Sequence, residues 1–324
     1  MTFFENAREG KNHWLLYVAL IMIGYFLCQI PSTVYLVAIL MGDILSHNRE
    51  AFEEKLQNLD TLLSSTIPGF VVIMLTFLIW MAATWLFFKM LHKRERMTLI
   101  SGEKTFRKSY FFWGTLIYAL FTILIPVFDM ITAPDSYTVN SPDSQFYLLL
   151  SLAVVLTPFQ TGCEELIFRG YLMQGFGLCT KSKFWALIIT SVMFGLLHSL
   201  NNEVIEYGFW KAIPIYVMVG LQLGFFAILC DGIEFSWGIH FINNLICFVL
   251  FSNEGGTMSE FAFIQFKREA VTVTDYIFPI ATTALIYLIF RKKMGWDLRK
   301  AFDNSGLKPI SASVTPPSTS TPEM

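Results

Sequence analysis

The sequence is poor in charged residues for its length. Asp, Glu, Lys and Arg make up only 15% of its 324 residues, and the formal net charge is −2. Proteins that bind nucleic acid concentrate basic residues in one patch, whereas here Lys and Arg stand in short segments between apolar runs. We therefore exclude a nucleic-acid partner.

Local motifs for metal and redox sites are also missing. The zinc-peptidase motif HExxH does not occur, and none of the cysteines has the CxxC or CxxH spacing that is typical of zinc or redox sites. Any metal site would have to be assembled from separate helices.

Apolar residues dominate the chain instead. Hydrophobic residues make up 54% of it, with 32 phenylalanines, and the mean hydropathy is +0.54. A soluble domain of this length does not need so much apolar surface. Runs of about 17 to 25 apolar residues predict an all-α, polytopic membrane protein of about eight transmembrane helices. The expected spans are 14–41, 69–88, 110–128, 146–178, 184–200, 212–230, 235–252 and 273–290.

Basic residues predict how these spans are oriented. They collect at 92–108, at the turn that contains Lys181 and Lys183, and in the segment after Arg291. Eight spans place both termini and these three basic segments on one side. The positive-inside rule predicts that this side is cytoplasmic.

Two further segments lie outside the spans. Residues 42–67 repeat leucine and phenylalanine at helical spacing among charged residues, which predicts an amphipathic helix on the outer surface. Residues 301–324 end in a Ser/Thr/Pro-rich stretch with no apolar face to bury, and we expect this tail to be disordered.

One span carries charged residues. The stretch CEELIFRGYL places Glu164, Glu165 and Arg169 in a run from 146 to 178 that holds no other charge. A charge at the centre of a membrane costs about 2.5 to 3.5 kcal/mol, so such residues pair with each other or face a polar cavity. Glu165 and Arg169 are one helical turn apart, which predicts an ion pair. Glu164 points about 100° away from Glu165 and needs another partner.

His198 is the first of two histidines that fall within spans. If the spans 146–178 and 184–200 form an antiparallel pair, Glu164 and His198 lie roughly 20 Å along their helices from the shared turn. The two side chains are therefore expected at the same depth.

His240 is the second, and it lies four residues before Asn244, on the same helix face. It is only about 10 Å from the start of its span. A tilted helix, or a connection at 230–236 that dips into the bundle, would bring His240 to the depth of Glu164.

A carboxylate, two imidazoles and an amide in a site of low dielectric constant suit hydrolysis. Glu164 can take a proton from water with the help of His198, while His240 and Asn244 donate hydrogen bonds to an oxyanion. These residues predict a water-activating peptidase with a buried active-site cavity. A transporter with a buried carboxylate relay is an alternative, but it would be expected to contain an inverted repeat, and none is evident.

Three motifs also carry a family resemblance. The sequence is similar to the CPBP family of CAAX proteases and bacteriocin-processing or bacteriocin-immunity proteins (the Abi group). The matching motifs are EExxxR (Glu164, Glu165, Arg169), FxxxH (Phe194, His198) and HxxxN (His240, Asn244).

The resemblance covers residues 146–252 and implies an all-helical intramembrane endopeptidase. In it, residues matching Glu164 and His198 activate water, and those matching His240 and Asn244 hold the oxyanion. The chain is then divided into three N-terminal spans with the outer segment (1–145), the catalytic core (146–252), the last span with a basic tail (253–300) and the disordered tail (301–324).

The same residues allow two mechanisms. We favour a glutamate mechanism without a cofactor, and zinc held by Glu164, His198 and His240 stays open as the alternative. Glu165 and Arg169 would orient Glu164, with Arg169 also a candidate for contact with a substrate carboxylate, and Phe194 would pack on His198.

The expected partners are the lipid bilayer and a membrane-associated peptide or protein substrate. A catalytically silent membrane scaffold or bacteriocin-immunity protein that keeps the fold is the alternative function.

Overall fold

The computed structural model describes residues 2–254, 256–267 and 271–307, and these are mostly helical. Apolar runs form continuous helices because a chain within a bilayer must satisfy its backbone hydrogen bonds internally. The α-helices are α1 (Trp14–Leu45), α2 (Arg49–Gln57), α3 (Leu59–Ser64), α4 (Ile67–His92), α5 (Lys108–Thr132), α6 (Ser144–Glu165), α7 (Met173–Thr180), α8 (Lys183–Leu197), α9 (Asn202–Tyr207), α10 (Phe209–Leu229), α11 (Glu234–Val249), α12 (Val273–Phe290) and α13 (Leu298–Ala301).

Short elements complete the chain. The strands β1 (Tyr137–Val139), β2 (Phe251–Asn253) and β3 (Ile264–Phe266) form a sheet in the order β1-β3-β2, with β3 antiparallel to β1 and parallel to β2. The π-helix η4 (Leu166–Leu172) joins α6 to α7. The 3₁₀-helices are η1 (Glu5–Arg8), η2 (Arg96–Leu99), η3 (Pro134–Ser136), η5 (Ser259–Phe261) and η6 (Ser305–Leu307).

Within the described residues, six helical segments are long and apolar enough to cross a membrane. They are α1, α4, α5, the continuous segment Ser144–Thr180, α10 and α12. This confirms an all-α, polytopic membrane protein. The expected count of eight is not confirmed, because α8 and α11, at the positions of the other two spans, have only 15 and 16 residues.

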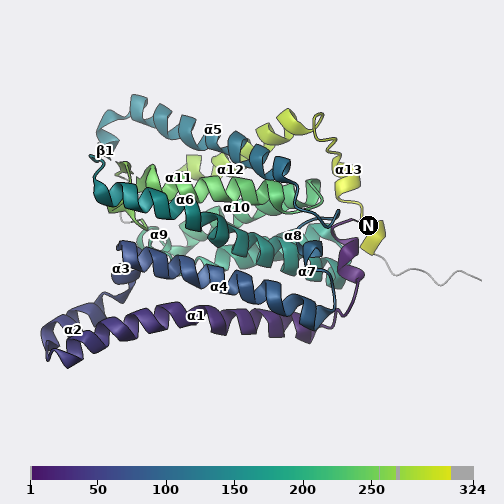
Figure 1. Cartoon of the computed structure of the whole chain (residues 1–324). Helices are drawn as coiled ribbons and strands as arrows, with labels where there is room; N and C mark the ends of the chain where they lie inside the picture. The colour runs from purple at the N-terminus through teal and green to yellow at the C-terminus, as the bar shows by residue number, and fades with distance from the viewer. Residues whose placement is uncertain (1, 255, 268–270, 308–324) are drawn as a thin grey trace, which may run out of the picture.

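The long helices lie side by side in one bundle, with α1 at one edge (Figure 1). α1 packs on α4, α4 on α6, and α6 on α11, which also contacts α5 and α10. Gly114 of α5 and Gly238 of α11 allow a close approach, since a Cβ atom on either would lie 2.2 Å from a backbone oxygen of the facing helix. α11 is therefore surrounded by neighbouring helices.

The N-terminus and the basic segments lie at the same end of the bundle, which we call the inner end (Figure 1). Lys104 Nζ lies 2.8 Å from Glu9 Oε1, and the backbone N–H of Lys183 donates to Asn304 Oδ1 at 2.9 Å. These contacts join the N-terminal segment, the 93–107 loop, the α7–α8 turn and the C-terminal segment. The grouping of the basic segments is as predicted from the sequence.

The connection between α10 and α11 is buried at the inner end. The Ile233 N–H donates to the backbone carbonyl of Ile100, in the 93–107 loop, at 2.8 Å. Arg107 donates to both carboxylate oxygens of Glu234, at 2.9 and 2.6 Å, and Glu234 is fully buried. Because this loop covers the connection, α11 begins below the surface of the bundle.

The segment 42–67 differs from the prediction of one amphipathic helix. It comprises the end of α1, followed by α2 and α3 at the opposite, outer end (Figure 1). His47 has a positive φ of 54°, and the Asn48 side chain caps α2 by accepting the Ala51 N–H. A residue in the left-handed region followed by a new N-cap ends one helix and starts another.

The predicted boundary of the disordered tail, at residue 301, is too early in the sequence. Residues 301–307 are folded, and Leu307 is buried in the same apolar cluster as Phe4. The N-terminal segment supplies the apolar partner that the tail's own sequence lacks, so the prediction is wrong for these residues. The rest of the predicted tail, 308–324, lies outside the described residues.

Candidate active site

The candidate site begins where α6 ends. The Asp143 side chain caps the start of α6 by accepting two backbone N–H groups, and Glu164 and Glu165 are the last two residues of the helix. The next seven residues form the π-helix η4. Short π-helical segments interrupt regular helices and frequently occur at functional sites.

Glu165, Arg169 and His240 form a buried ionic cluster. Arg169 Nη1 donates to Glu165 Oε1 at 2.8 Å, and His240 Nδ1 lies 2.9 Å from the same oxygen. Arg169 also donates to the Gly220 carbonyl of α10 at 3.2 Å. The predicted ion pair is present, and the carboxylate fixes the hydrogen of His240 on Nδ1, because a carboxylate only accepts.

Glu164 faces a second, uncharged group of polar side chains. Gln160 Nε2 donates to Glu164 Oε1, and Gln160 Oε1 accepts from Asn244 Nδ2 at 3.1 Å. Glu164 Oε2 lies 3.7 Å from His240 Nε2 and is buried without a hydrogen-bond partner among the described residues. Asn244 Nδ2 lies 3.4 Å from His240 Nε2. One carboxylate oxygen, one imidazole nitrogen and one amide nitrogen therefore converge.

His198 follows the last residue of α8 and lies at the edge of this cluster. Its Nδ1 donates to the Phe194 carbonyl at 2.7 Å, and its ring stacks on Tyr216 with centroids 4.3 Å apart. The Phe194 ring contacts the rings of both His198 and His240, at 4.5 and 5.9 Å. No hydrogen bond joins His198 to Glu164 within the described part of the chain. Because Nδ1 carries the hydrogen, Nε2 is the nitrogen that can accept a proton.

The buried connection before α11 explains how His240 reaches the depth of Glu165. The sequence suggested either a tilted helix or a connection that dips into the bundle. The structure has a buried connection, which the 93–107 loop covers. His240 can therefore lie near the inner end of α11 and still contact the last turn of α6.

Sequence reasoning missed two residues of the cluster, Gln160 and Tyr216. Gln160 lies four residues before Glu164 in an otherwise apolar span, and this spacing could have identified it. Tyr216 lies in the apolar helix α10, where an aromatic residue carries no signal of its own.

Two of the expected zinc ligands, Glu164 Oε2 and His240 Nε2, lie 3.7 Å apart. His240 donates Nδ1–H to Glu165 and His198 donates Nδ1–H to the Phe194 carbonyl, so both rings keep Nε2 as the nitrogen that could ligate a metal. Across the residues that the structure describes, no group of three or more His, Cys, Asp or Glu is arranged to hold a metal ion.

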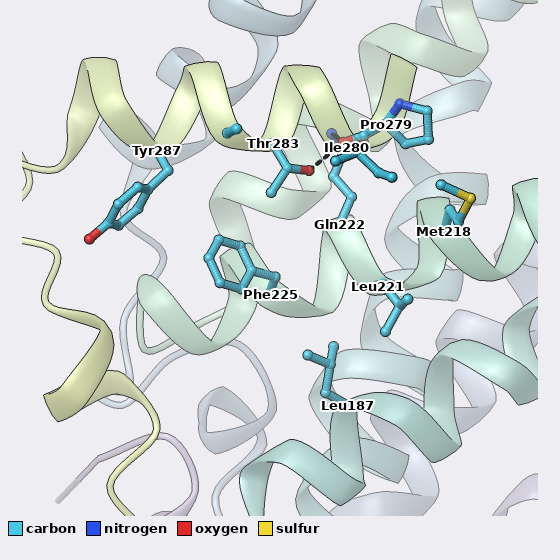
Figure 2. A pocket seen from close by; sticks show the side chains of 10 residues that line it. Leu187, Met218, Leu221, Gln222, Phe225, Pro279, Ile280, Thr283 and Tyr287 are labelled. Atoms are coloured by element: carbon cyan, nitrogen blue, oxygen red, sulfur yellow. Dashed lines mark hydrogen bonds between the residues drawn. The ribbon is translucent and has the colours of Figure 1, made fainter. Parts of the chain in front are cut away.

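A groove of about 500 Å³ lies elsewhere, between α10 and α12 with one residue of α8 (Figure 2). Its lining is mostly apolar and includes Leu187, Gln222 and Tyr287. These residues are different from those of the Glu164 cluster, so the groove is not the candidate active site.

The fold and the cluster together define an integral membrane protein with buried carboxylate, imidazole and amide groups that are typical of hydrolytic sites. Residues 143–246 match the family described as Type II CAAX prenyl endopeptidase Rce1-like. The uncharacterized protein YyaK of Bacillus subtilis (strain 168) is 31% identical over 248 residues, which cover 76% of this chain and 80% of that protein. No solved structure matches significantly.

The chain belongs to this Rce1-like family. Membership confirms the resemblance that the three motifs predicted, and it supports a peptidase of the CAAX-protease type that is embedded in a membrane.

Proposed function

We propose that the protein is an intramembrane endopeptidase that hydrolyses a peptide bond of a membrane-associated protein or peptide, with water activated by Glu164. The observation that carries this proposal is Glu164 Oε2, which is buried, lacks a hydrogen-bond partner in the described residues and lies 3.7 Å from His240 Nε2. A buried acceptor that is left unsatisfied is costly. A water molecule that donates to this oxygen would satisfy it and would be held next to a general base.

In the first step, Glu164 takes a proton from this water while the water oxygen bonds to the carbonyl carbon of the scissile peptide. The carbonyl electron pair moves onto oxygen, which becomes the oxyanion. His198 supports the proton transfer through Nε2, because its Nδ1 is already bonded to the Phe194 carbonyl.

The oxyanion is stabilised from α11. Asn244 Nδ2 carries two hydrogens. Gln160 Oε1 accepts one, and the other lies toward His240 Nε2 at 3.4 Å, which accepts it as long as only Nδ1 of that ring carries hydrogen. When the His240 ring also carries a hydrogen on Nε2, this nitrogen becomes a donor, and it and the second Asn244 N–H can both bond to the oxyanion. The C–N bond then breaks as the proton held by Glu164 passes to the leaving nitrogen, which gives a carboxylic acid and an amine.

Glu165 and Arg169 act through His240. The Arg169 guanidinium bonds to Glu165 and to the Gly220 carbonyl and lies 4.5 Å from the centre of the Phe194 ring. Arg169 already makes these contacts, and only 1% of the residue is exposed. A positioning role therefore fits Arg169 better than contact with a substrate carboxylate.

The membrane location limits the class of substrate. The family description names a prenyl endopeptidase that acts on CAAX sequences, and we infer a lipid-anchored C-terminal peptide as the first substrate class to test. The basic residues of the inner end favour a cytoplasmic location for both termini.

The test is peptide cleavage by the purified protein in lipid vesicles. The panel contains a farnesylated peptide that ends in a CAAX sequence, the same peptide without the lipid, and a hydrophobic leader peptide. Glu164→Gln and His198→Ala should each lower the rate by at least about 10²-fold, while the protein still inserts and stays monodisperse.

Glu206→Gln is the matched control, because Glu206 is an exposed carboxylate on α9, and it should leave the rate unchanged. Full activity of Glu164→Gln would refute the assignment of the base. Failure of the wild-type protein to cleave any peptide would favour the silent scaffold or immunity protein instead.

A further inference from the structure

Gln160 is a buried polar residue that the proposed reaction steps do not use. It lies on α6 one turn before Glu164 and is 5% exposed. Both ends of its amide are bonded within the site, since Nε2 donates to Glu164 Oε1 and Oε1 accepts from Asn244 Nδ2 at 3.1 Å. Gln160 is therefore the direct link between the proposed base on α6 and the proposed oxyanion donor on α11.

The Glu164 carboxylate fixes the direction of these hydrogen bonds. An ionised carboxylate only accepts, so the nitrogen of Gln160 faces Glu164 and its oxygen faces Asn244. That oxygen in turn requires the nitrogen of Asn244, and Asn244 Oδ1 is left to accept from Asn243 Nδ2 at 3.1 Å. Without Gln160, the Asn244 amide could rotate and present its oxygen to the substrate, where an acceptor would repel the oxyanion.

We propose that Gln160 is a positioning residue for peptide hydrolysis, an inference that rests on the proposed function. It holds the Glu164 carboxylate through Oε1, which leaves Oε2 for water. It also orients the amide of Asn244 so that an N–H group, and not the carbonyl oxygen, faces the developing charge.

Gln222 offers a matched comparison within the same molecule. It is also a buried glutamine, 3% exposed, on a membrane-spanning helix. Its amide accepts from Tyr118 and donates to the Pro279 carbonyl and to Thr282, beside the α10–α12 groove (Figure 2). Gln222 joins helices without touching the Glu164 cluster, so it separates the general effect of a buried amide from the specific effect of Gln160.

The experiment compares Gln160→Met and Gln222→Met in the peptide-cleavage assay, because methionine keeps the length of the side chain and removes both hydrogen-bonding groups. Gln160→Met should lower kcat by about tenfold to a hundredfold, as expected for lost hydrogen bonds to a charged group, with KM unchanged. Gln222→Met should keep the wild-type kcat even if it lowers thermal stability. If Gln160→Met does not insert, Gln160→Ser removes the same two bonds with a smaller polar side chain.

A double-mutant cycle with Asn244→Ala distinguishes positioning from a structural role. If Gln160 acts through Asn244, adding Gln160→Met to Asn244→Ala should cost less in kcat than it does in the wild-type protein. Wild-type kcat in Gln160→Met would overturn the proposal, and an equal loss in both backgrounds would overturn the role of Gln160 in orienting Asn244. The proposed function has its own tests: it fails if the wild-type protein cleaves no peptide or if Glu164→Gln remains fully active.

Discussion

Replacing Arg169 by alanine should destabilise the fold and slow the reaction at the same time. The side chains of Arg169 and Glu165 are 2% and 0% exposed, and Arg169 is one of the two partners of Glu165 Oε1. Removing it leaves a buried carboxylate that is paired only with His240, and breaking a buried ion pair costs about 3 to 5 kcal/mol. At about 2 to 4 °C per kcal/mol, the melting temperature should fall by roughly 6 to 20 °C.

Thermal unfolding in detergent, followed by tryptophan fluorescence, measures this change. Arg49→Ala is the control, because Arg49 and Glu53 form an ion pair with the same spacing, at 2.7 Å, but with 89% and 54% of their side chains exposed. Exposed pairs add little to stability, so the control should keep the wild-type melting temperature.

The double variant Glu165→Gln with Arg169→Ala should recover part of the stability, since it no longer buries an unpaired charge. The cleavage rate should stay low in both variants, because His240 has lost part or all of its ionic support. A lower rate with an unchanged melting temperature in Arg169→Ala would refute this reasoning and would indicate that Arg169 contacts the substrate directly.

Three other predictions concern the site and its connection to the inner end. Asn244→Ala should lower the rate by roughly 10² to 10³ without changing metal content, and Asn244→Asp should lower it further because a carboxylate repels the oxyanion; a wild-type rate in either variant would contradict the role of Asn244. Wild-type protein should contain less than one zinc per chain and remain active after dialysis against a strong chelator; stoichiometric zinc that is lost together with activity in His240→Ala would overturn the metal-free mechanism. Burial raises the pKa of Asp231, so the folded chain binds this proton more tightly than the unfolded chain, and stability from this group falls as pH rises from the unfolded pKa to the raised folded pKa. Asp231→Asn should weaken that pH dependence in thermal unfolding above about pH 4, and an unchanged profile would contradict it.

Local spacing predicted several contacts correctly, because residues four apart on a helix meet whatever surrounds them. Glu165 and Arg169 are bonded at 2.8 Å, and Asn244 Nδ2 lies 3.4 Å from His240 Nε2. The same rule applies to Gln160 and Glu164, which are also four residues apart on α6. That contact was not predicted because Gln160 is uncharged, and the prediction started from the charged residues and histidines of the spans.

The position of His240 could not be predicted from apolar runs. A run gives the length of a helix and not the depth at which it begins. Here the depth depends on contacts between distant segments, such as the bond from Arg107 to Glu234, which are 127 residues apart. The same limit applies to the number of spans, since α8 and α11 are helices of 15 and 16 residues within the bundle.

The sequence by itself determined that this is an all-α membrane protein, that its basic segments lie at one end, and which side chains are too polar for a membrane unless they meet. Those features follow from composition, charge and helical spacing, which act over a few turns of chain. Only the tertiary structure decided that Glu165, and not Glu164, bonds to His240, that Glu164 keeps one oxygen free, and that Gln160 connects Glu164 to Asn244. These depend on how α6 and α11 are rotated and how deeply α11 is set, and packing among all the neighbouring helices fixes both.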